Sequence, residues 1–197
     1  MIKKKRVAAL CKACKRLQMQ TTPGNEQWIG NGTAMYILAG IEPMSAESLA
    51  SMLDYTEKDY SKISFFEGKM PVEVFGEENS TDVQIEAPPK RVIIRNSEYL
   101  IFETAKELIF IDGDYLKPIV TDGQTTFFMR KLPESNYNFL CVKKGFLPEA
   151  IIAGVEFSEK SLYEWFDDLA CIITSIQNKY LLHLEKEAES DEQLMLE

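Results

Sequence analysis

The sequence predicts an α+β fold: a mostly antiparallel sheet or sheets, short N-terminal helices, and one long C-terminal amphipathic helix packed on the sheet. Three observations lead to this prediction. Short segments rich in β-branched and aromatic residues follow one another closely between residues 91 and 153. Helical spacing of apolar residues precedes them in residues 4–14 and follows them, over a longer stretch, from Ser158 onward. The 197 residues are 45% hydrophobic and 27% charged, as in a folded globular chain.

The N-terminal elements follow from spacing and turn chemistry. Apolar side chains recur at three- and four-residue intervals in residues 4–14, which predicts a short helix. Residues 17–21 alternate between apolar and polar, and residues 23–25 are the turn formers Pro-Gly-Asn. We therefore expect a β-hairpin that returns through residues 27–29, followed by a strand over residues 34–38.

Two short helices and a weak stretch come next. Ser45 is placed to cap one helix, and Thr56 with Glu57 is placed to cap a second that runs to Tyr60. Residues 76–89 have the weakest apolar pattern in the middle of the chain. We expect a loop there with one edge strand, residues 83–86.

The segment from Arg91 to about residue 153 has the pattern of consecutive strands. Turn residues such as Asp-Gly and Asn-Ser separate the apolar segments. The spacing leaves no room for crossover helices, so the strands should pair antiparallel. The expected strands are residues 92–94, 99–102, 108–111, 125–129, 139–142 and 151–153.

The last expected element is a helix of roughly seven turns, about 40 Å long at 1.5 Å per residue. Its apolar stripe is broad, which suits packing on the chain's own sheet, but a helix of this length also has surface for a partner. Both interpretations stay open. The residues that would present the stripe to a partner are Leu162, Trp165, Leu169, Ile176 and Tyr180.

The expected organisation is a single α+β domain over residues 1–188, with possible subdomains 1–75 and 90–188. Residues 189–197 form an acidic tail that we expect to be disordered. No run approaches the roughly 20 apolar residues of a membrane span. The basic start is not followed by the apolar block of a signal peptide. These features predict a cytoplasmic protein with no membrane partner and with reduced cysteines.

The charge is negative overall but locally basic. Lys and Arg number 22 against 31 Asp and Glu, a net charge of −9, which argues against nucleic acid wrapped over the whole surface. Residues 1–16 nevertheless hold seven basic side chains and no acid. A solvated terminus explains this cluster, and a nucleic-acid contact is the alternative. The candidate contact residues are Lys3, Lys4, Lys5 and Arg6.

No motif for catalysis, a cofactor or a metal stands out. Cys11 and Cys14 form a CxxC without the second ligand pair of a zinc site, so we expect both to face the core. The single histidine, His183, has no triad partners at suitable spacing. The Asp112–Asp114 segment lacks the glutamate that a calcium loop needs at its twelfth position. We therefore expect a non-enzyme without cofactor or metal.

Two resemblances add to these expectations. Residues 27–36, 115–119 and 142–147 resemble a family of uncharacterised proteins encoded by phages and mobile elements of Gram-positive bacteria. That resemblance brings no assigned activity. Together with the apolar stripe from Leu162 to Leu184, it leads us to expect a non-catalytic interaction or accessory protein of a phage or mobile element that binds itself or a protein partner through the C-terminal helix. Residues 107–157 resemble the closing half of a sliding-clamp domain, which implies as an alternative a DNA-associated accessory factor. Residues 193–197 are similar to the short peptides that dock onto clamps.

Overall fold

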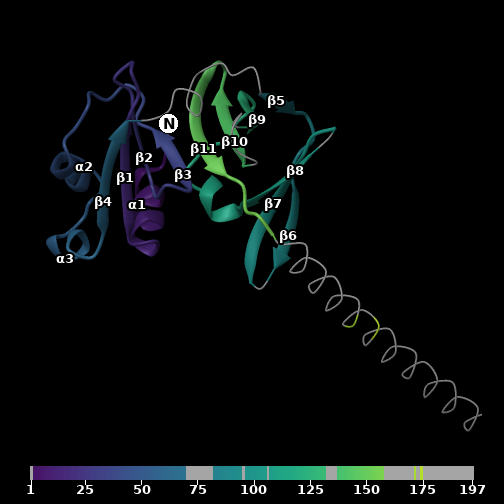
Figure 1. Ribbon diagram of the computed structural model, residues 1–197, viewed down its shortest axis with the longest axis horizontal. Coiled ribbons are helices and arrows are strands. Elements are labelled where there is room, and N and C mark those ends of the chain that lie inside the picture. Colours follow the sequence, from purple (N-terminus) through teal and green to yellow (C-terminus); the bar gives the residue numbers. More distant parts are fainter. Residues whose placement is uncertain are drawn as a thin grey trace, which may run out of the picture. The chain divides into compact units, whose positions relative to one another are not determined.

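The structure is a computed structural model that describes residues 2–69, 82–94, 96–105, 107–131 and 137–157, together with positions 171 and 174. Contacts divide the chain into two compact units, Met1–Val155 and Glu156–Glu197. Almost all described residues belong to the first unit, whose elements are labelled in Figure 1.

The described chain is mostly β, with 45% of its residues in strands and 19% in helices. The α+β class expected from the sequence is therefore wrong. The strands extend beyond the apolar runs that predicted them, and one further strand was missed, so the sequence pattern underestimated the β content. The long helix expected from Ser158 lies outside the described residues, apart from positions 171 and 174. Within the described part, no helix is long and apolar enough to cross a membrane.

The larger sheet has eight strands in the order β4-β1-β2-β3-β11-β10-β9-β5. Neighbouring strands pair antiparallel, except β1 and β4, which are parallel. The pairing of β3 with β11 sets Met35 opposite Ile151 and joins the first strands of the chain to its last described strands (Figure 1). The bounds are β1 (Arg16–Thr21), β2 (Gln27–Gly30), β3 (Ala34–Ile37), β4 (Ser64–Lys69), β5 (Val83–Ile85), β9 (Thr125–Lys131), β10 (Asn138–Lys144) and β11 (Leu147–Ala153).

Strand β4 is the strand that sequence reasoning missed. A strand parallel to β1 needs a long connection across the sheet, and part of that connection is formed by helices α2 (Ala46–Met52) and α3 (Glu57–Tyr60). Both caps predicted from the sequence are present. Ser45 Oγ accepts a hydrogen bond from the Ser48 amide at 3.3 Å, and Thr56 Oγ1 accepts one from the Asp59 amide at 3.2 Å.

A second, three-stranded sheet is antiparallel in the order β6-β7-β8. Its strands are β6 (Lys90–Ile94), β7 (Ser97–Glu103) and β8 (Leu108–Asp112), and the 3₁₀ helix η1 (Gly113–Leu116) follows directly. Asp112 Oδ1 accepts a hydrogen bond from the Asp114 amide at 2.9 Å. The segment Asp112–Asp114, which lacks the glutamate of a calcium loop, therefore supplies the N-cap of η1.

The main hydrophobic core lies between the larger sheet, helix α1 (Lys4–Ala13) and strands β7 and β8. Its members include Cys11, Leu17, Phe102, Ile111 and Leu140. A second cluster contains Trp28, Met35, Ile37, Cys141 and Ile151. Successive strand residues point to opposite faces, and β2 and β3 are buried at every position. Both faces of the sheet centre are therefore covered.

A buried ionic cluster links the edge strand β5 to β9 and β10. Asp82, directly before β5, accepts hydrogen bonds from Arg130 Nε at 2.6 Å and Nη2 at 2.8 Å. Lys143 Nζ donates to the same carboxylate at 2.9 Å. The side-chain exposures are 8% for Asp82, 0% for Arg130 and 9% for Lys143. The cluster thus holds the short strand β5 in its place at the sheet edge.

Candidate binding site: a basic cavity beside the N-terminal helix

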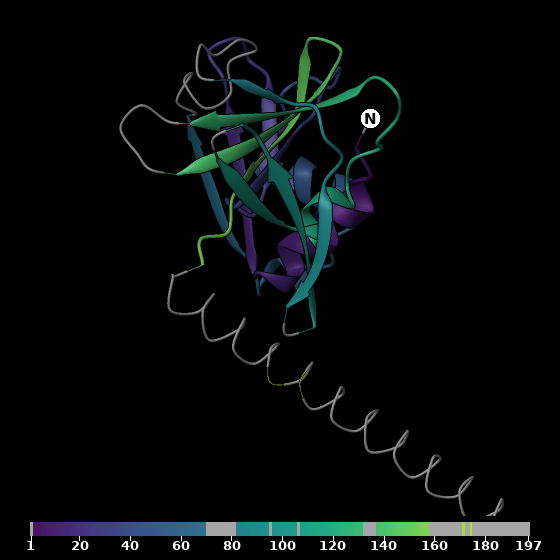
Figure 2. The same cartoon turned by 90° about the vertical axis from the view of Figure 1, so that its right-hand side faces the viewer.

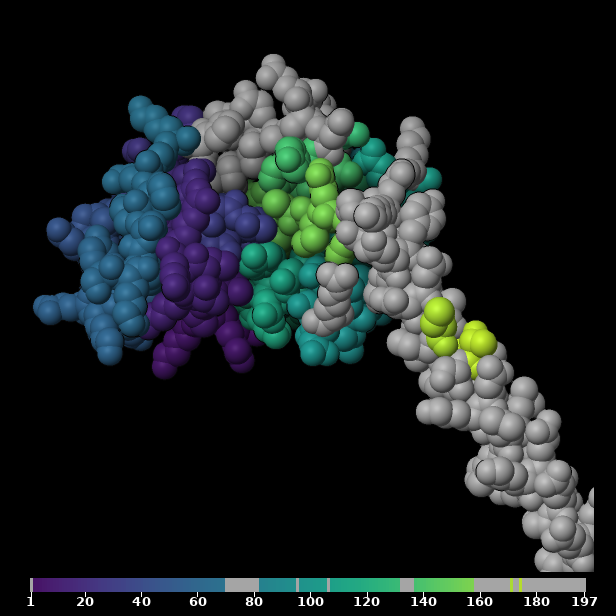
Figure 3. Space-filling view, turned by 60° about the horizontal axis from the view of Figure 1, so that its bottom comes forward, coloured from purple at the N-terminus to yellow at the C-terminus, as the bar shows by residue number. Residues whose placement is uncertain are grey.

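A cavity of 710 Å³ opens where the start of α1, the three-stranded sheet and the segment after β8 meet. We call it the basic cavity because four cationic side chains line it: Lys3, Arg6, Arg91 and Lys117. On the surface in Figure 3, the purple N-terminal residues lie beside the teal segments that supply the other walls. Glu98, Thr121, Gly113 and two prolines, Pro88 and Pro89, complete the polar and rigid parts of the lining.

The first two cations are positioned by the beginning of α1. The Lys3 amide donates to the Pro118 carbonyl at 2.7 Å, and the Lys3 carbonyl accepts from the Arg6 amide at 2.8 Å. Lys3 and Arg6 are three residues apart, so their side chains share one face of the helix start. Figure 2 shows this part of the chain beside the teal strands of the smaller sheet. A backbone hydrogen bond therefore joins the start of α1 to Pro118, which is far from it in the sequence.

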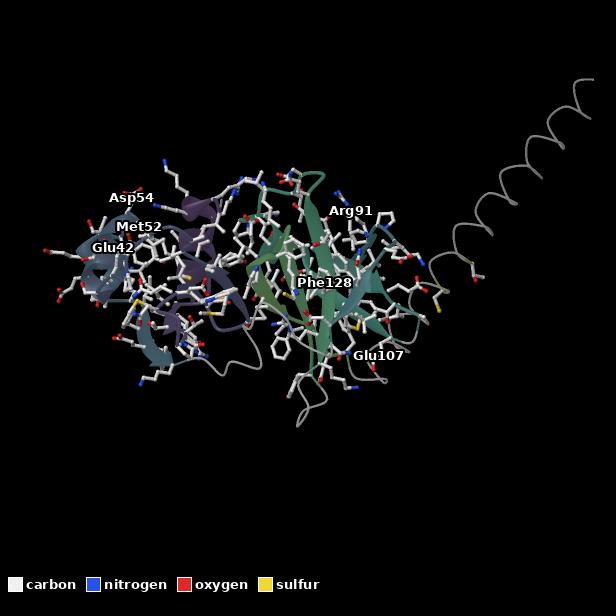
Figure 4. The ribbon with its side chains drawn as sticks, turned by 90° about the horizontal axis from the view of Figure 1, so that it is seen from above. Glu42, Met52, Asp54, Arg91, Glu107 and Phe128 are labelled. Carbon is white, nitrogen blue, oxygen red and sulfur yellow. The ribbon has the colours of Figure 1, made fainter. Side chains whose placement is uncertain are left out.

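Arg91 enters the cavity from β6. It pairs across the sheet with Leu100, and its Nη1 lies 3.4 Å from Glu98 Oε1 on the neighbouring strand. In Figure 4, Arg91 lies on the opposite side of the strands from Glu107, whose ion pair with Lys131 at 3.1 Å is separate from the cavity.

Lys117 enters from the turn after η1, where it forms an ion pair with Asp114. The hydrogen bond to Asp114 raises the pKa of Lys117, and the negative charge of Glu98 acts in the same direction. The positive charge of Arg6 acts in the opposite direction. Lys117 therefore stays protonated at neutral pH. Its charge interacts with the charges of both Arg6 and Glu98.

The floor of the cavity is apolar. The rings of Phe102 and Phe127 lie 5.1 Å apart between centroids, with an angle of 47° between their planes. Phe102 is fully buried and belongs to the main core, so the floor is continuous with that core. The other apolar side chains of the lining are Leu100, Leu116 and Ile119.

The charge of the cavity opposes that of the whole chain. Four cations and one carboxylate line the cavity, whereas the chain carries a net charge of −9. Within the described residues, Lys3 and Arg6 form no ion pair, while Arg91 pairs with Glu98 and Lys117 with Asp114. An anionic group would therefore meet its least compensated positive charge at Lys3 and Arg6.

The side chains that line the cavity are cationic, acidic, hydroxyl-bearing and apolar. Its one hydroxyl belongs to Thr121, and it contains no cysteine or histidine. In the described ranges, no cluster of His, Cys, Asp and Glu side chains could hold a metal ion. Charge-assisted hydrogen bonds to an anion and apolar contact are the chemistry that these residues offer.

The structure separates the four nucleic-acid candidates predicted from the sequence. Lys3 and Arg6 line the cavity, whereas Lys4 and Lys5 are exposed on α1 and do not. Sequence reasoning missed Arg91 and Lys117, because no local pattern shows that strand pairing and the Lys3–Pro118 contact bring them to the same place. The partner-binding candidates Leu162, Trp165, Leu169, Ile176 and Tyr180 lie outside the described residues, as does His183.

The CxxC pair divides into a buried and an exposed thiol. Cys11 belongs to the main core, and its burial raises the pKa of its thiol to about 12. Cys14 is exposed, and its Sγ accepts a hydrogen bond from Asn31 Nδ2 at 3.1 Å. The expectation that both cysteines face the core is therefore right for Cys11 and wrong for Cys14.

Comparisons with protein-family models, with curated proteins and with solved structures find no match for this chain. The resemblances to phage-encoded proteins and to a sliding-clamp domain therefore stay predictions. Any functional assignment depends on the geometry of the cavity.

Proposed function

We propose that this chain is a non-catalytic binding protein whose basic cavity takes an anionic group attached to an apolar body. The observation that carries the proposal is the set of four cations around an apolar floor in an otherwise acidic chain. The expectation that the C-terminal helix binds a partner is a separate prediction on residues outside the described ranges.

The size and lining of the cavity support this class of ligand. Its 710 Å³ falls within the roughly 300–1,000 Å³ of pockets that enclose small molecules. Leu100 and Phe127, the partly exposed side chains of the floor, gain free energy when they are covered by apolar surface, at about 25 cal/mol per Å². Arg6 and Lys3 supply charge-assisted hydrogen bonds for the anion.

A matched pair of fluorescent probes tests the proposal. 8-Anilinonaphthalene-1-sulfonate carries an anion on an aromatic body, and N-phenyl-1-naphthylamine is its uncharged counterpart. We expect saturable binding of the sulfonate, and about tenfold weaker binding in the Lys3→Gln/Arg6→Gln variant because it loses charged hydrogen bonds. The uncharged probe should bind both proteins equally. Lys4→Gln/Lys5→Gln is the control, since it removes the same charge from the same helix outside the cavity.

The control variant also separates the alternative function. A DNA-associated factor would use phosphate contacts of all four basic residues, so both double variants should lower the salt dependence of duplex binding. A cavity ligand requires only Lys3 and Arg6. The proposal is wrong if the two double variants weaken sulfonate binding equally, or if the charged and uncharged probes bind with the same affinity and the same response to substitution.

A further inference from the structure

The two ends of the basic cavity differ in charge balance. Lys3 and Arg6 form one end, and neither has an ion-pair partner among the residues that the structure describes. At the other end, Arg91 lies 3.4 Å from the Glu98 carboxylate. Helix η1 separates the two ends, because Glu98 lies against Gly113 at its start and Lys3 bonds to Pro118 just after its end. An elongated ligand therefore meets an anion-binding end and a neutral, polar end.

Glu98 lies at the polar end, beside Arg91 and Gly113. It lies on β7 opposite Ile93 of β6, diagonally across from Arg91. Its backbone and carboxylate lie against Gly113: a Cβ at that glycine would be 3.2 Å from the Glu98 carbonyl oxygen and 3.3 Å from Oε2. The Glu98 side chain is still 42% exposed. A carboxylate accepts several hydrogen bonds, so Glu98 can accept one from a ligand while it stays beside Arg91.

The apolar lining of the cavity includes aromatic and proline rings. Phe127, Leu100 and the rigid pair Pro88-Pro89 are part of it. Proline rings and aromatic rings offer contact area without losing much conformational freedom. This surface suits a planar group better than a branched one.

We propose that the cavity binds a nucleoside phosphate, with the phosphate at Lys3 and Arg6 and an amino group of the base donating to Glu98. The proposal rests on the proposed function and names its ligand class. A nucleoside phosphate combines an anion, a planar body and a donor edge in one molecule of a size that pockets of this volume enclose. Glu98 is then the residue that determines specificity, because its carboxylate accepts from an amino group and has no proton to donate to a base that offers only acceptors there.

Calorimetric titration with four small molecules tests each contact. Adenosine 5′-monophosphate should bind most tightly, and purine riboside 5′-monophosphate, which has hydrogen in place of the amino group, about tenfold more weakly. Adenosine and ribose 5-phosphate should each lose one end of the interaction. Lys3→Gln/Arg6→Gln should weaken the two monophosphates and leave adenosine unchanged.

Glu98→Gln is the decisive variant. A glutamine amide can accept from an amino group or donate to a ring nitrogen, so the preference for the adenine nucleotide over the purine riboside nucleotide should fall close to one. A preference that survives this substitution would show that Glu98 does not contact the base. Glu103→Gln, on the same strand as Glu98 but outside the cavity and paired with Lys90, is the control and should change neither affinity.

The outcomes distinguish this inference from the proposed function. If the naphthalenesulfonate binds as expected but millimolar adenosine 5′-monophosphate neither binds nor displaces it, the nucleotide assignment is wrong and the proposed function stands. If the sulfonate itself does not bind, both are wrong. Competition by a short deoxyadenosine oligonucleotide with a 5′-phosphate, and not by its 5′-hydroxyl form, would identify the end of a strand as the source of the nucleoside phosphate. Lack of competition would identify a free nucleotide.

Discussion

Replacing Asp82 should destabilise the protein more than replacing any surface acid of the described part. Asp82→Asn removes the charge that compensates Arg130, which is 0% exposed, and Lys143, which is 9% exposed. The bidentate contacts of 2.6 and 2.8 Å are those of a strong charge-assisted pair. Removing one member of a buried ion pair typically costs about 3–5 kcal/mol, because the remaining charge stays buried. Urea unfolding at pH 7 measures this loss.

The pH dependence of the same variant gives a second, independent test. Burial by itself raises the pKa of Asp82, but the hydrogen bonds from Arg130 and Lys143 outweigh it, so the pKa is lowered from its usual 3.8. The folded state then binds the proton less well than the unfolded state. Its stabilising contribution is complete above the unfolded pKa and disappears as the pH falls through the folded pKa. The difference in unfolding free energy between wild type and Asp82→Asn should therefore shrink in acid.

The comparison variant is Asp122→Asn, which disrupts the solvent-exposed ion pair with Lys144. Exposed pairs contribute little to stability, so this variant should unfold close to wild type. A loss for Asp82→Asn that is as small as that of Asp122→Asn, or one that is the same at pH 7 and in acid, would refute the reasoning.

Two further predictions concern thiols and glycines. In a Cys171→Ser background, which removes the other exposed thiol, a thiol reagent at pH 8 should modify Cys14 rapidly and Cys11 and Cys141 only after unfolding. Burial raises their pKa values to about 12 and about 11; fast modification of three thiols in the folded protein would contradict this. Gly30→Ala should cost about 3 kcal/mol by overpacking, since its Cβ would lie 1.8 Å from the Ala34 carbonyl oxygen. Gly68→Ala, with no atom within 4 Å, is the thermal-unfolding control, and equal melting temperatures would disprove the clash.

Local pattern predicted the positions of the elements better than it predicted the fold class. The hairpin of β1 and β2, both helix caps and the edge strand β5 follow from alternation, turn residues and capping side chains that act within a few residues. Strand β4 was not predicted because buried and exposed positions alternate weakly along it, with four of its six positions exposed. The fold class was wrong because a long helical periodicity was given the same weight as the strands, whose full length is determined by pairing with distant partners.

The residues of the candidate site could be predicted from the sequence only in part. A basic N-terminal cluster is visible in the sequence, yet only Lys3 and Arg6 of its members line the cavity. Which members do so depends on helix rotation and on the hydrogen bond from Lys3 to Pro118. Arg91 is one of many charged residues on an exposed strand and carries no distinguishing pattern. Its role depends on strand register, which sets it opposite Leu100 and diagonal to Glu98.

The construction of the cavity also connects binding to the docking of the N-terminus. Its anion-binding end exists only while the residues before α1 lie against the turn after η1, since the Lys3 amide bonds to Pro118 and Lys3 occupies the N-cap position of α1. A ligand that contacts both Lys3 and Lys117 adds free energy to that docked state and none to an undocked one. Net charge cannot reveal such a site, because a chain with a net charge of −9 contains a cavity in which cations outnumber carboxylates. For this chain, the informative quantity is therefore the local charge at the junction of α1 and the smaller sheet.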